Sequence, residues 1–416
     1  MILLKRERIG ELGESKYRKI QFVSFYFGEF NSLAFILCEC NLPVRIFFME
    51  FLGYFFKYRV LLKILYYLCF IVLKPIYVMF CKRLFILLFL FIAFYVNSLS
   101  QISKWDGSAI CWTKGDGSET HPYLIDSASH LAYLAQSVNA GRMYADTFFR
   151  LSTHIDLDTL DWTPIGCSVS EFFAGHFDGD NHSIYHLYCK DTAQRPSIVC
   201  TGLFGYVMDA EIYNLHIAGN SEILSSFSTS YNFYVGGIAG YAYASEIRNC
   251  SFDGKLSVYA VSSFAYAGGI VGYAASGTNI YNCHNKGKIF SSSLNTAYAG
   301  GILADCDNAS PKIKYCYNEG YVYATAHKYT YAGGVVARLN YGASVERCFN
   351  SGDVETYSNS CSYIGGLIGW GSNCLVKESY NEGVVNAIAY DYSYAGGVVG
   401  FTEFPSVIEH VYNRGR

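Results

Sequence analysis

The feature that most constrains the fold is a short motif that recurs through the C-terminal half of the chain. It reads Tyr-x-Gly-Gly followed by aliphatic or small residues, as in "YAGGIVGY", and successive copies begin 31 to 33 residues apart. The six tyrosines that open the copies are Tyr234, Tyr266, Tyr298, Tyr331, Tyr363 and Tyr394. A repeat of this length predicts a stacked array in which each copy is one structural unit.

A second motif follows each copy, as in "IYNCHNKG" and "IKYCYNEG". It begins with an aliphatic residue each time, at Ile247, Ile280, Ile313, Val345, Val376 and Ile408. Degenerate copies at Ile184 and Ile212 extend the series to eight units. The chain has 39 glycines against 7 prolines and no helical periodicity in the repeats, which favours many short strands joined by glycine turns. Each unit is therefore predicted to be one coil, of about 32 residues, of an all-β parallel β-solenoid (β-helix).

Stacked coils would place like residues over one another at the strand spacing of about 4.8 Å. One such column is predicted to be an asparagine ladder at a turn, with left-handed backbone at the asparagines and a glycine two residues later that allows the bend. Its members are Asn285, Asn318, Asn350, Asn381 and Asn413. The cysteine column is Cys250, Cys283, Cys316 and Cys348, and it continues as Ser379 and Val411. We interpret it as small buried side chains, because a metal site needs ligands that converge on one point.

The six tyrosines that open the repeats form the candidate ligand-binding column. Stacked rings could make an external aromatic strip that suits sugar rings or a protein partner, or they could fill the interior of the coils. The structural role is the favoured interpretation. The segments just before the tyrosines, such as "FSSSLNTA" and "YATAHKYT", vary most between copies. A bound partner is expected there first.

The N-terminal quarter of the chain is strongly apolar. Residues 79–100 have the basic start, apolar core and small final residues of a secretory signal peptide, with cleavage predicted before Gln101. Residues 1–78 are predicted to be an upstream extension without a native fold. The alternative is a membrane-embedded N-terminus, although lysines such as Lys57 and Lys63 interrupt its apolar segments.

The exported part divides into an N-terminal cap region, 101–183, and the solenoid repeats, 184–416. Apolar residues at helical spacing predict one helix over Ser127–Asn139, with Asp126 or Ser127 as its N-cap. This helix would cover the open end of the first coil. The chain ends within a repeat, so we expect it to be truncated before a C-terminal cap or further domain.

The cap region also holds most of the acidic candidates for chemistry, which are Asp156, Asp158, Asp161, Asp178 and Asp180. A glycosidase needs two carboxylates about 5 to 10 Å apart, and calcium needs several oxygen ligands. The stretch "HFDGDNH" nevertheless favours a tight turn with left-handed positions. The exported part has no zinc-protease, serine-nucleophile or phosphate-loop motif, so no catalytic residue, metal or cofactor is assigned and the chain is predicted not to be an enzyme.

Two passages carry a family resemblance. The stretch from Leu124 to Gly141 and "TGLFGYV" at Thr201 resemble the GLUG-repeat proteins, which are secreted and surface proteins common in gut Bacteroidetes. The resemblance implies a right-handed β-solenoid opened by a short α/β cap, exported, with adhesin-like or structural roles. The same repeat occurs beside an immunoglobulin-A-cleaving peptidase domain, so fold analogy does not transfer that activity. Ala304 and Ala337 depart from the family pattern by replacing its third glycine.

These features together predict a non-catalytic scaffold or adhesin-like binding module, secreted or on the outer membrane of a bacterium. Its expected partners are glycans or host or cell-surface proteins, with membrane contact only through the N-terminal apolar segments. A formal net charge of -3 gives no electrostatic support for nucleic acid. The alternatives are a carbohydrate-binding module that uses the tyrosines and a β-helix enzyme acting on polysaccharides.

Overall fold

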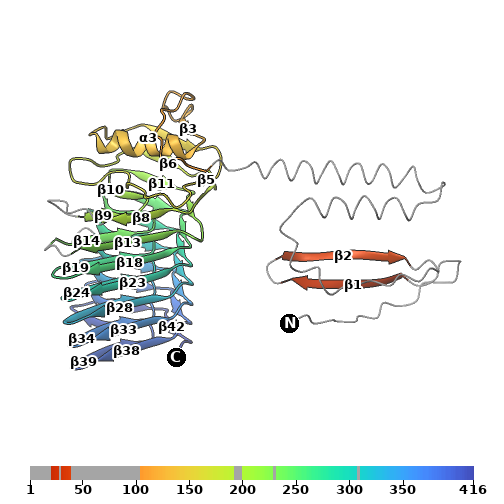
Figure 1. Ribbon diagram of the computed structural model, residues 1–416. Helices are drawn as coiled ribbons and strands as arrows, with labels where there is room; N and C mark the ends of the chain where they lie inside the picture. Colours follow the sequence, from red (N-terminus) through yellow and green to blue (C-terminus); the bar gives the residue numbers. More distant parts are fainter. Residues whose placement is uncertain (1–19, 28–29, 39–103, 192–198, 228–230, 307–309) are drawn as a thin grey trace. The chain divides into compact units, whose positions relative to one another are not determined.

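The computed structural model describes residues 20–27, 30–38, 104–191, 199–227, 231–306 and 310–416, which belong to two compact units, Met1–Ser98 and Leu99–Arg416 (Figure 1). In the first unit, β1 (Ile20–Phe27) pairs antiparallel with β2 (Phe30–Cys38). The predicted signal segment, 79–100, lies outside the described residues, as does most of the predicted extension. Among the described residues, no helix is both long and apolar enough to cross a membrane.

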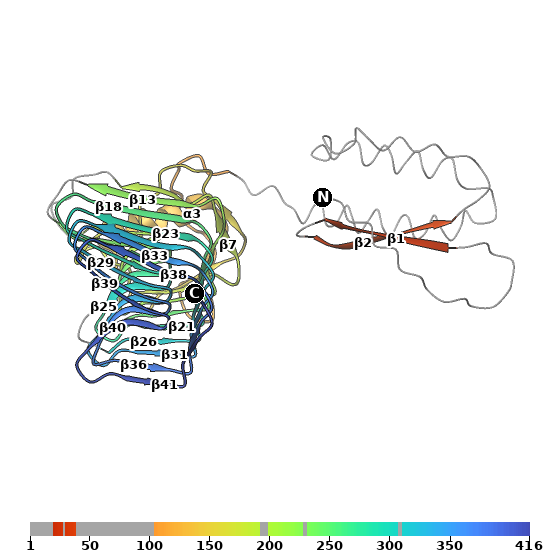
Figure 2. The same ribbon diagram turned by 90° about the horizontal axis from the view of Figure 1, so that it is seen from below.

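The second unit is a parallel β-solenoid, as predicted. A full coil contains five short strands, and each strand pairs in parallel with its counterpart in the next coil. The five resulting sheets are numbered I to V in the order in which the chain visits them within a coil. Figure 2 views the stacked coils along the solenoid from the end that carries the C-terminus.

The strands of each sheet succeed one another coil by coil. Sheet I contains β8 (Tyr188–Asp191), β13 (Glu222–Phe227), β18 (Lys255–Ala260), β23 (Lys288–Ser293), β28 (Val322–Ala326), β33 (Val354–Ser358) and β38 (Val385–Ala389). Sheet II contains β9 (Val199–Thr201), β14 (Phe233–Gly236), β19 (Phe264–Gly268), β24 (Thr296–Gly300), β29 (Tyr329–Gly333), β34 (Cys361–Gly365) and β39 (Tyr392–Gly396). Sheet III contains β10 (Phe204–Met208), β15 (Ala239–Tyr243), β20 (Val271–Ala275), β25 (Leu303–Cys306), β30 (Val336–Asn340), β35 (Ile368–Ser372) and β40 (Val399–Glu403).

Sheets IV and V reach further toward the N-terminus than the other three. Sheet IV contains β3 (Tyr123–Ile125), β4 (Phe148–Leu151), β6 (His176–Asp178), β11 (Glu211–Tyr213), β16 (Glu246–Arg248), β21 (Asn279–Tyr281), β26 (Lys312–Lys314), β31 (Ser344–Glu346), β36 (Leu375–Lys377) and β41 (Val407–Glu409). Sheet V contains β5 (Ile155–Asp156), β7 (Ser183–Tyr185), β12 (His216–Ile217), β17 (Ser251–Phe252), β22 (His284–Asn285), β27 (Tyr317–Asn318), β32 (Phe349–Asn350), β37 (Tyr380–Asn381) and β42 (Tyr412–Asn413). The parallel stacking therefore continues into the region 101–183.

The interior of the coils is filled by aliphatic residues in register. The aliphatic head of the second motif points inward, as the sequence predicts, and it is fully buried at Ile247, Ile280, Ile313, Val345 and Val376. In the last coil the equivalent Ile408 is 42% exposed. Burying each such side chain contributes about 1.5 to 3 kcal/mol, so the column is one component of the hydrophobic stabilisation.

The asparagine ladder is present. Each side-chain Nδ2 donates to Oδ1 of the asparagine one coil further on, at 2.7 Å from Asn285 to Asn318 and from Asn318 to Asn350. The bonds from Asn350 to Asn381 and from Asn381 to Asn413 measure 2.8 Å. The first four of these residues are completely buried, so the amide hydrogen bonds form in a dry environment where an unpaired polar group would be costly.

The backbone prediction for these asparagines is wrong. They lie in the short strands of sheet V, and a left-handed residue lies three positions before each of them, for example Asn282 with φ 49° and Tyr315 with φ 58°. Nor do the glycines that follow the ladder have positive φ. At Gly320 a Cβ atom would instead overlap the carbonyl oxygen of Gly287 in the preceding coil. Glycine is needed there because the backbones of successive coils approach closely.

The two sequence motifs meet inside the coil. The second glycine of the Tyr-x-Gly-Gly motif lies directly against the ladder asparagine of the same coil, as Gly301 does against Asn318 and Gly334 against Asn350. A Cβ atom on either glycine would overlap the asparagine side chain. In the first full coil Phe252 occupies the asparagine position and contacts Gly237 in the same way. The second glycine is therefore a packing requirement of the ladder, whereas a Cβ atom on the first would overlap a backbone carbonyl oxygen, as Gly300 would with that of Leu303.

The cap carries one helix among the described residues, α3 (Ala128–Asn139). Ser127 is its N-cap, and the Ser127 hydroxyl accepts a hydrogen bond from the His130 amide at 3.3 Å. Its buried face includes Leu131, Leu134 and Val138, which confirms the predicted helix. Figure 1 shows α3 across the N-terminal end of the solenoid, where it covers the first strands.

The substitution Asn318→Ala should lower the free energy of unfolding by about 3 kcal/mol, as measured by chemical denaturation. The substitution removes the hydrogen bonds to Asn350 and to the Gly320 carbonyl, and it leaves Nδ2 of Asn285 without its acceptor. The control is Asn386→Ala, an exposed position in β38. Equal losses of unfolding free energy in the two variants would contradict a stabilising role of the ladder.

Candidate functional site

The tyrosine column, defined as Tyr234, Tyr266, Tyr298, Tyr331, Tyr363 and Tyr394, lies on the outer face of sheet II. In β19, Ala265 and Ala267 belong to the main core, while Tyr266 between them belongs to a separate cluster on the opposite face. The rings stack coil on coil, with successive centroids 4.5 to 5.1 Å apart and planes within 23° of parallel. The column therefore does not fill the coil interior.

Nor is most of the column an open strip, because side chains from sheet III cover it. A register column on that sheet runs through Tyr206, Tyr241, Tyr273, Asp305, Arg338, Trp370 and Phe401. Tyr273 meets Tyr266 edge to face at 5.7 Å. The tyrosine exposure rises from 4% at Tyr266 and Tyr298 to 37% at Tyr394 in the last coil. The two columns form one packed aromatic seam outside the main core.

An ion pair interrupts the aromatic residues in this seam. Asp305 is fully buried, and Arg338 binds it through two hydrogen bonds, one of which joins Nε to Oδ1 at 2.8 Å. The guanidinium lies 4.9 Å from the ring centroid of Tyr298. A buried carboxylate is tolerable when it is paired in this bidentate way. The ion pair of Asp305 and Arg338 therefore packs against the ring of Tyr298 in the middle of the seam.

Face-to-face stacking limits what the tyrosine column can bind. Each internal ring has a neighbour on both faces, so only edges and hydroxyl groups remain for contact. Burial raises the pKa of Tyr234 and of Tyr331 to about 12, and it raises the pKa of Tyr266, Tyr298 and Tyr363 as well. These phenols stay neutral well beyond physiological pH.

A second stacked column was missed by the sequence analysis. It lies on sheet V and consists of His284, Tyr317, Phe349, Tyr380 and Tyr412, with centroids 4.8 to 5.1 Å apart. The signal was available, because the residue before each ladder asparagine is aromatic in these coils. The rings are partly exposed, but they too are nearly parallel and cover one another's faces.

The outer face of sheet I is different, because Phe290 is inclined to both of its aromatic neighbours, while Tyr321 and Tyr323 are within 9° of parallel with centroids 6.4 Å apart. Phe290 and Tyr323 are neighbours in the strand register, yet their planes are inclined at 60° with centroids 6.2 Å apart. Tyr321 is inclined at 56° to Phe290, and its hydroxyl donates to Glu355 at 2.7 Å. All three rings are partly exposed. Ring faces are therefore accessible here, in the variable segments where the sequence analysis expected a partner.

Hydroxyl groups surround these rings. The outward positions of the same strands that carry hydroxyl groups are Ser257, Tyr259, Ser292, Thr325 and Tyr357. Tyr259 and Tyr357 are 45% and 48% exposed. We call the outward residues of β18, β23, β28 and β33, together with Tyr321, the sheet I face. It combines aromatic surface with hydrogen-bonding groups on a rigid sheet.

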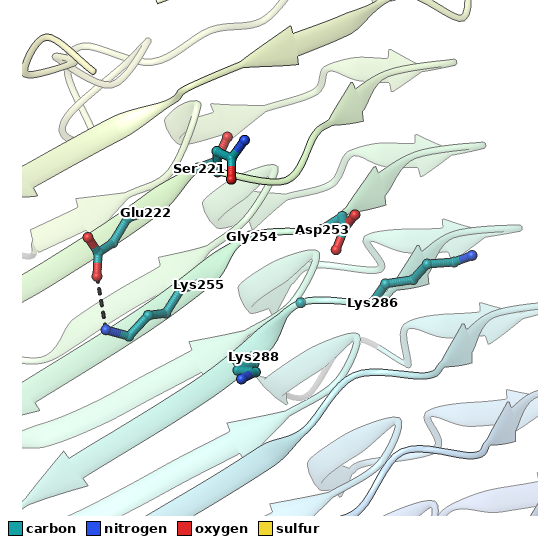
Figure 3. Close-up of a pocket in the computed structure, with 9 residues that line it drawn as sticks. Ser221, Glu222, Asp253, Gly254, Lys255, Lys286 and Lys288 are labelled. Carbon is teal, nitrogen blue, oxygen red and sulfur yellow. Dashed lines mark hydrogen bonds and ion pairs between the residues drawn. The ribbon is translucent and has the colours of Figure 1, made fainter. Parts of the chain in front are cut away.

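A shallow depression of about 440 Å³ adjoins the sheet I face at its corner with sheet V (Figure 3). Its lining includes Ser221, Glu222, Lys255, Lys286 and Lys288. Lys255 forms an ion pair with Glu222 at 3.0 Å, and Figure 3 shows their side chains turned toward each other. Lys286 pairs with Glu319 at 3.1 Å on the other side of the corner.

The acidic residues of the cap mainly hold turns and strands. The Asp178 carboxylate accepts a hydrogen bond from the side-chain amide of Asn214 at 3.0 Å and forms an ion pair with Arg150 at 3.2 Å. Asp180 has φ 47°, which confirms the predicted left-handed turn. Asp156 contacts His186 at 2.8 Å.

The other two acidic candidates also have partners. Asp158 pairs with Lys104 at 2.5 Å, and Asp161 accepts from the amide of Lys190 at 2.8 Å. Across the described residues, no group of three or more His, Cys, Asp or Glu side chains is arranged to hold a metal ion.

The cysteine column is buried, as interpreted from the sequence. The Cys316 thiol donates to the carbonyl oxygen of Lys314 at 3.3 Å, and the Cys316 amide donates to the sulfur of Cys348 at 3.4 Å. The same pattern holds for Cys283. Burial raises the pKa of the Cys283 and Cys348 thiols. The thiols of this column thus donate to backbone carbonyl groups of their own coil and accept from backbone amides of the preceding coil.

Alkaline pH should destabilise the solenoid through the tyrosine column. The folded-state pKa of Tyr234 and Tyr331 exceeds the unfolded value, so the unfolded chain loses these protons first as pH rises. The contribution is complete below about pH 10 and is lost between about pH 10 and pH 12. Denaturant unfolding across this range, with phenolate absorbance followed in parallel, measures the loss. A Tyr331→Phe variant keeps the ring and should lose less stability, whereas an unchanged loss would contradict this assignment.

Comparison with known proteins identifies the repeat. The sequence pattern of the GLUG motif family matches residues 231–259 and 265–289. No curated protein matches the chain. A solved structure named "putative immunoglobulin A1 protease from Bacteroides ovatus" is 19% identical, with a TM-score of 0.38, over 66% of this chain and 80% of that one. A second, named "IgA1 Protease", is 16% identical with a TM-score of 0.39, over 68% of this chain and 21% of that one.

These comparisons correct one prediction. Both solved structures carry the name of a protease, which contradicts the expectation that the chain is not an enzyme, and that expectation is withdrawn. TM-scores below 0.5 carry no argument for an activity of this chain. The two motif matches lie in successive coils, and the same pattern continues through the later coils to the end of the chain. The chain therefore carries GLUG motifs, at residues 231–259 and 265–289.

Proposed function

We propose that this chain is an exported, adhesin-like binding module that holds glycans on the sheet I face. The observation that carries the proposal is the splayed arrangement of Phe290, Tyr321 and Tyr323, whose planes are inclined at 56° and 60° about Phe290. It is the arrangement among the three aromatic surfaces in which ring faces stay open. Its location on the surface of a bacterium, or in its surroundings, rests on the signal-like segment 79–100.

Open ring faces suit sugars for an electrostatic reason. The face of an aromatic ring is the negative part of its quadrupole, and the C–H groups of a pyranose ring are weakly positive. Hydroxyl groups of Ser257, Ser292 and Thr325 lie beside the rings and can exchange hydrogen bonds with sugar hydroxyls. Since the sheet holds its side chains in a fixed register, little conformational entropy is lost when a ligand binds.

The tyrosine column supports the proposal less well. Its rings cover one another's faces at 4.5 to 5.1 Å, and Tyr266 and Tyr298 are 4% exposed. A sugar could reach the edges of its partly exposed members, but it could not stack on them. The column therefore fits a structural role at the seam between sheets II and III.

A protein partner is the competing occupant of the sheet I face. Tyrosine and serine together also dominate antibody paratopes, where tyrosine supplies rigid contact area and serine supplies adaptable hydrogen bonds. The splayed rings favour glycans, because sugar stacking requires a free ring face. Binding to surface proteins after removal of their glycans would identify the competing occupant.

The test is a glycan array probed with the full chain and with a double variant, Phe290→Ala with Tyr323→Ala. The parent should bind a restricted set of glycans, and the double variant should lose at least about tenfold in affinity, since each ring contributes about 1 kcal/mol. The control is Tyr281→Ala, which removes a partly exposed ring from the outer face of sheet IV. Circular dichroism checks that each variant keeps its β content.

The outcomes separate clearly. Selective binding that survives in the control and falls in the double variant supports a sugar site on the sheet I face. Absence of binding by the parent to every glycan, or equal losses from the two variants, would remove the proposal.

A further inference from the structure

We infer that the sheet I face selects glycans that carry a carboxylate, which it recognises through Lys288 at the corner with sheet V. The inference rests on the proposed glycan binding and adds the chemical class of the ligand. It is carried by the distribution of charge around the depression of Figure 3.

One line of charges runs along the first outward position of sheet I. Glu222, Lys255 and Lys288 are directly opposite one another in successive strands. Two like charges that face each other across adjacent strands are unfavourable unless something neutralises them. Glu222 neutralises Lys255 at 3.0 Å. On its other side Lys288 is followed by Tyr321 of the next coil, whose carbonyl oxygen accepts a hydrogen bond from the Ile289 amide at 2.8 Å.

The second line of charges follows the corner itself, and its lysine is already paired. Lys286 lies between Asp253 and Glu319 of the neighbouring coils, and it forms an ion pair with Glu319 at 3.1 Å. Both acids raise the pKa of Lys286, and the hydrogen bond that Lys286 donates to Glu319 is the largest cause. Figure 3 shows Lys286 extending to the side opposite Lys255. Lys286 and Glu319 are thereby engaged with each other and not with Lys288.

Lys288 is the lysine of the corner that has no ion-pair partner among the residues that the structure describes, and it is exposed. Beside it the depression is lined by Asn220, Ser221 and Asp253 and by two glycines, Gly254 and Gly287, which leave room for a ligand. A single negative group on a ligand would pair with Lys288.

The distance between Lys288 and Phe290 indicates which shape of ligand could contact both residues. Lys288 and Phe290 are two residues apart on one strand and face the same side, so they are separated by roughly 7 Å. That separation lets a sugar ring lie on Phe290 while a carboxylate attached to the ring reaches the Lys288 ammonium. Ser257, opposite Phe290 in the register, can hydrogen-bond to the sugar hydroxyls.

The charge of the corner favours a monoanion such as a uronate carboxylate. Lys288 supplies one positive charge that no ion pair of the described residues engages, and Glu222, Asp253 and Glu319 all lie at the same corner. A dianionic phosphate or a densely sulfated chain would bring additional negative charge near these acids. A carboxylate matches the one free cation that the described residues provide here.

The experiment measures binding of the full chain to trigalacturonate and to the same trisaccharide with its carboxyl groups reduced to alcohols. The parent should bind the acidic form at least about tenfold more tightly, because a hydrogen bond to a charged group is stronger than a neutral one. This preference should shrink as salt is raised, since the site is exposed. Lys288→Gln should abolish the preference and leave binding of the reduced form unchanged.

The matched control is Lys312→Gln, which removes one exposed lysine from the outer face of sheet IV. It should keep the full preference. If Lys288→Gln retains the preference, or if the parent binds both trisaccharides equally, the carboxylate inference is overturned while glycan binding stands. If the parent binds neither of these nor any glycan of the array, both the inference and the proposed function fail.

Discussion

The structure depends on the contact between the ladder asparagine and the second glycine of each Tyr-x-Gly-Gly motif. The asparagine amide is buried and hydrogen-bonded to the next coil at 2.7 to 2.8 Å, so its position along the solenoid is specified to within a fraction of an ångström. The glycine must lie against it, because any Cβ there would overlap the asparagine. Two segments about half a repeat apart are thereby held in one register.

Because of that register, equivalent outward side chains of successive coils lie in columns. The packing of neighbouring sheets then determines which columns stay accessible to a ligand. Where sheets II and III meet, the tyrosine column is covered by its neighbours and becomes a seam with a buried ion pair. On sheet V the rings stack in the open, but they still cover one another. On sheet I the side chains differ between coils, and Phe290 is inclined to the rings of Tyr321 and Tyr323. Irregularity within a regular stack is thus what creates a surface able to hold a ligand.

Charge follows the same principle. Along sheet IV, lysines and glutamates of neighbouring coils compensate each other, as Lys314 with Glu346 and Lys377 with Glu409 do at 3.0 Å. Such exposed pairs contribute little to stability. At the corner beside sheet I this alternation is broken by two lysines in succession. A site for an anion arises there from a single departure from the pattern.

The sequence by itself determined the solenoid, its repeat length, the inward aliphatic column, the asparagine ladder and the cap helix, because each depends on spacing along the chain and on stacking of like residues. Only the tertiary structure decided which face the tyrosine column occupies. A strand's alternation shows that Tyr266 and Ala267 point to opposite sides, but the surroundings of the outer side depend on how sheet III folds against sheet II. The reason for the second glycine of the motif was likewise hidden, since its contact with the asparagine joins two parts of the coil that no local pattern connects.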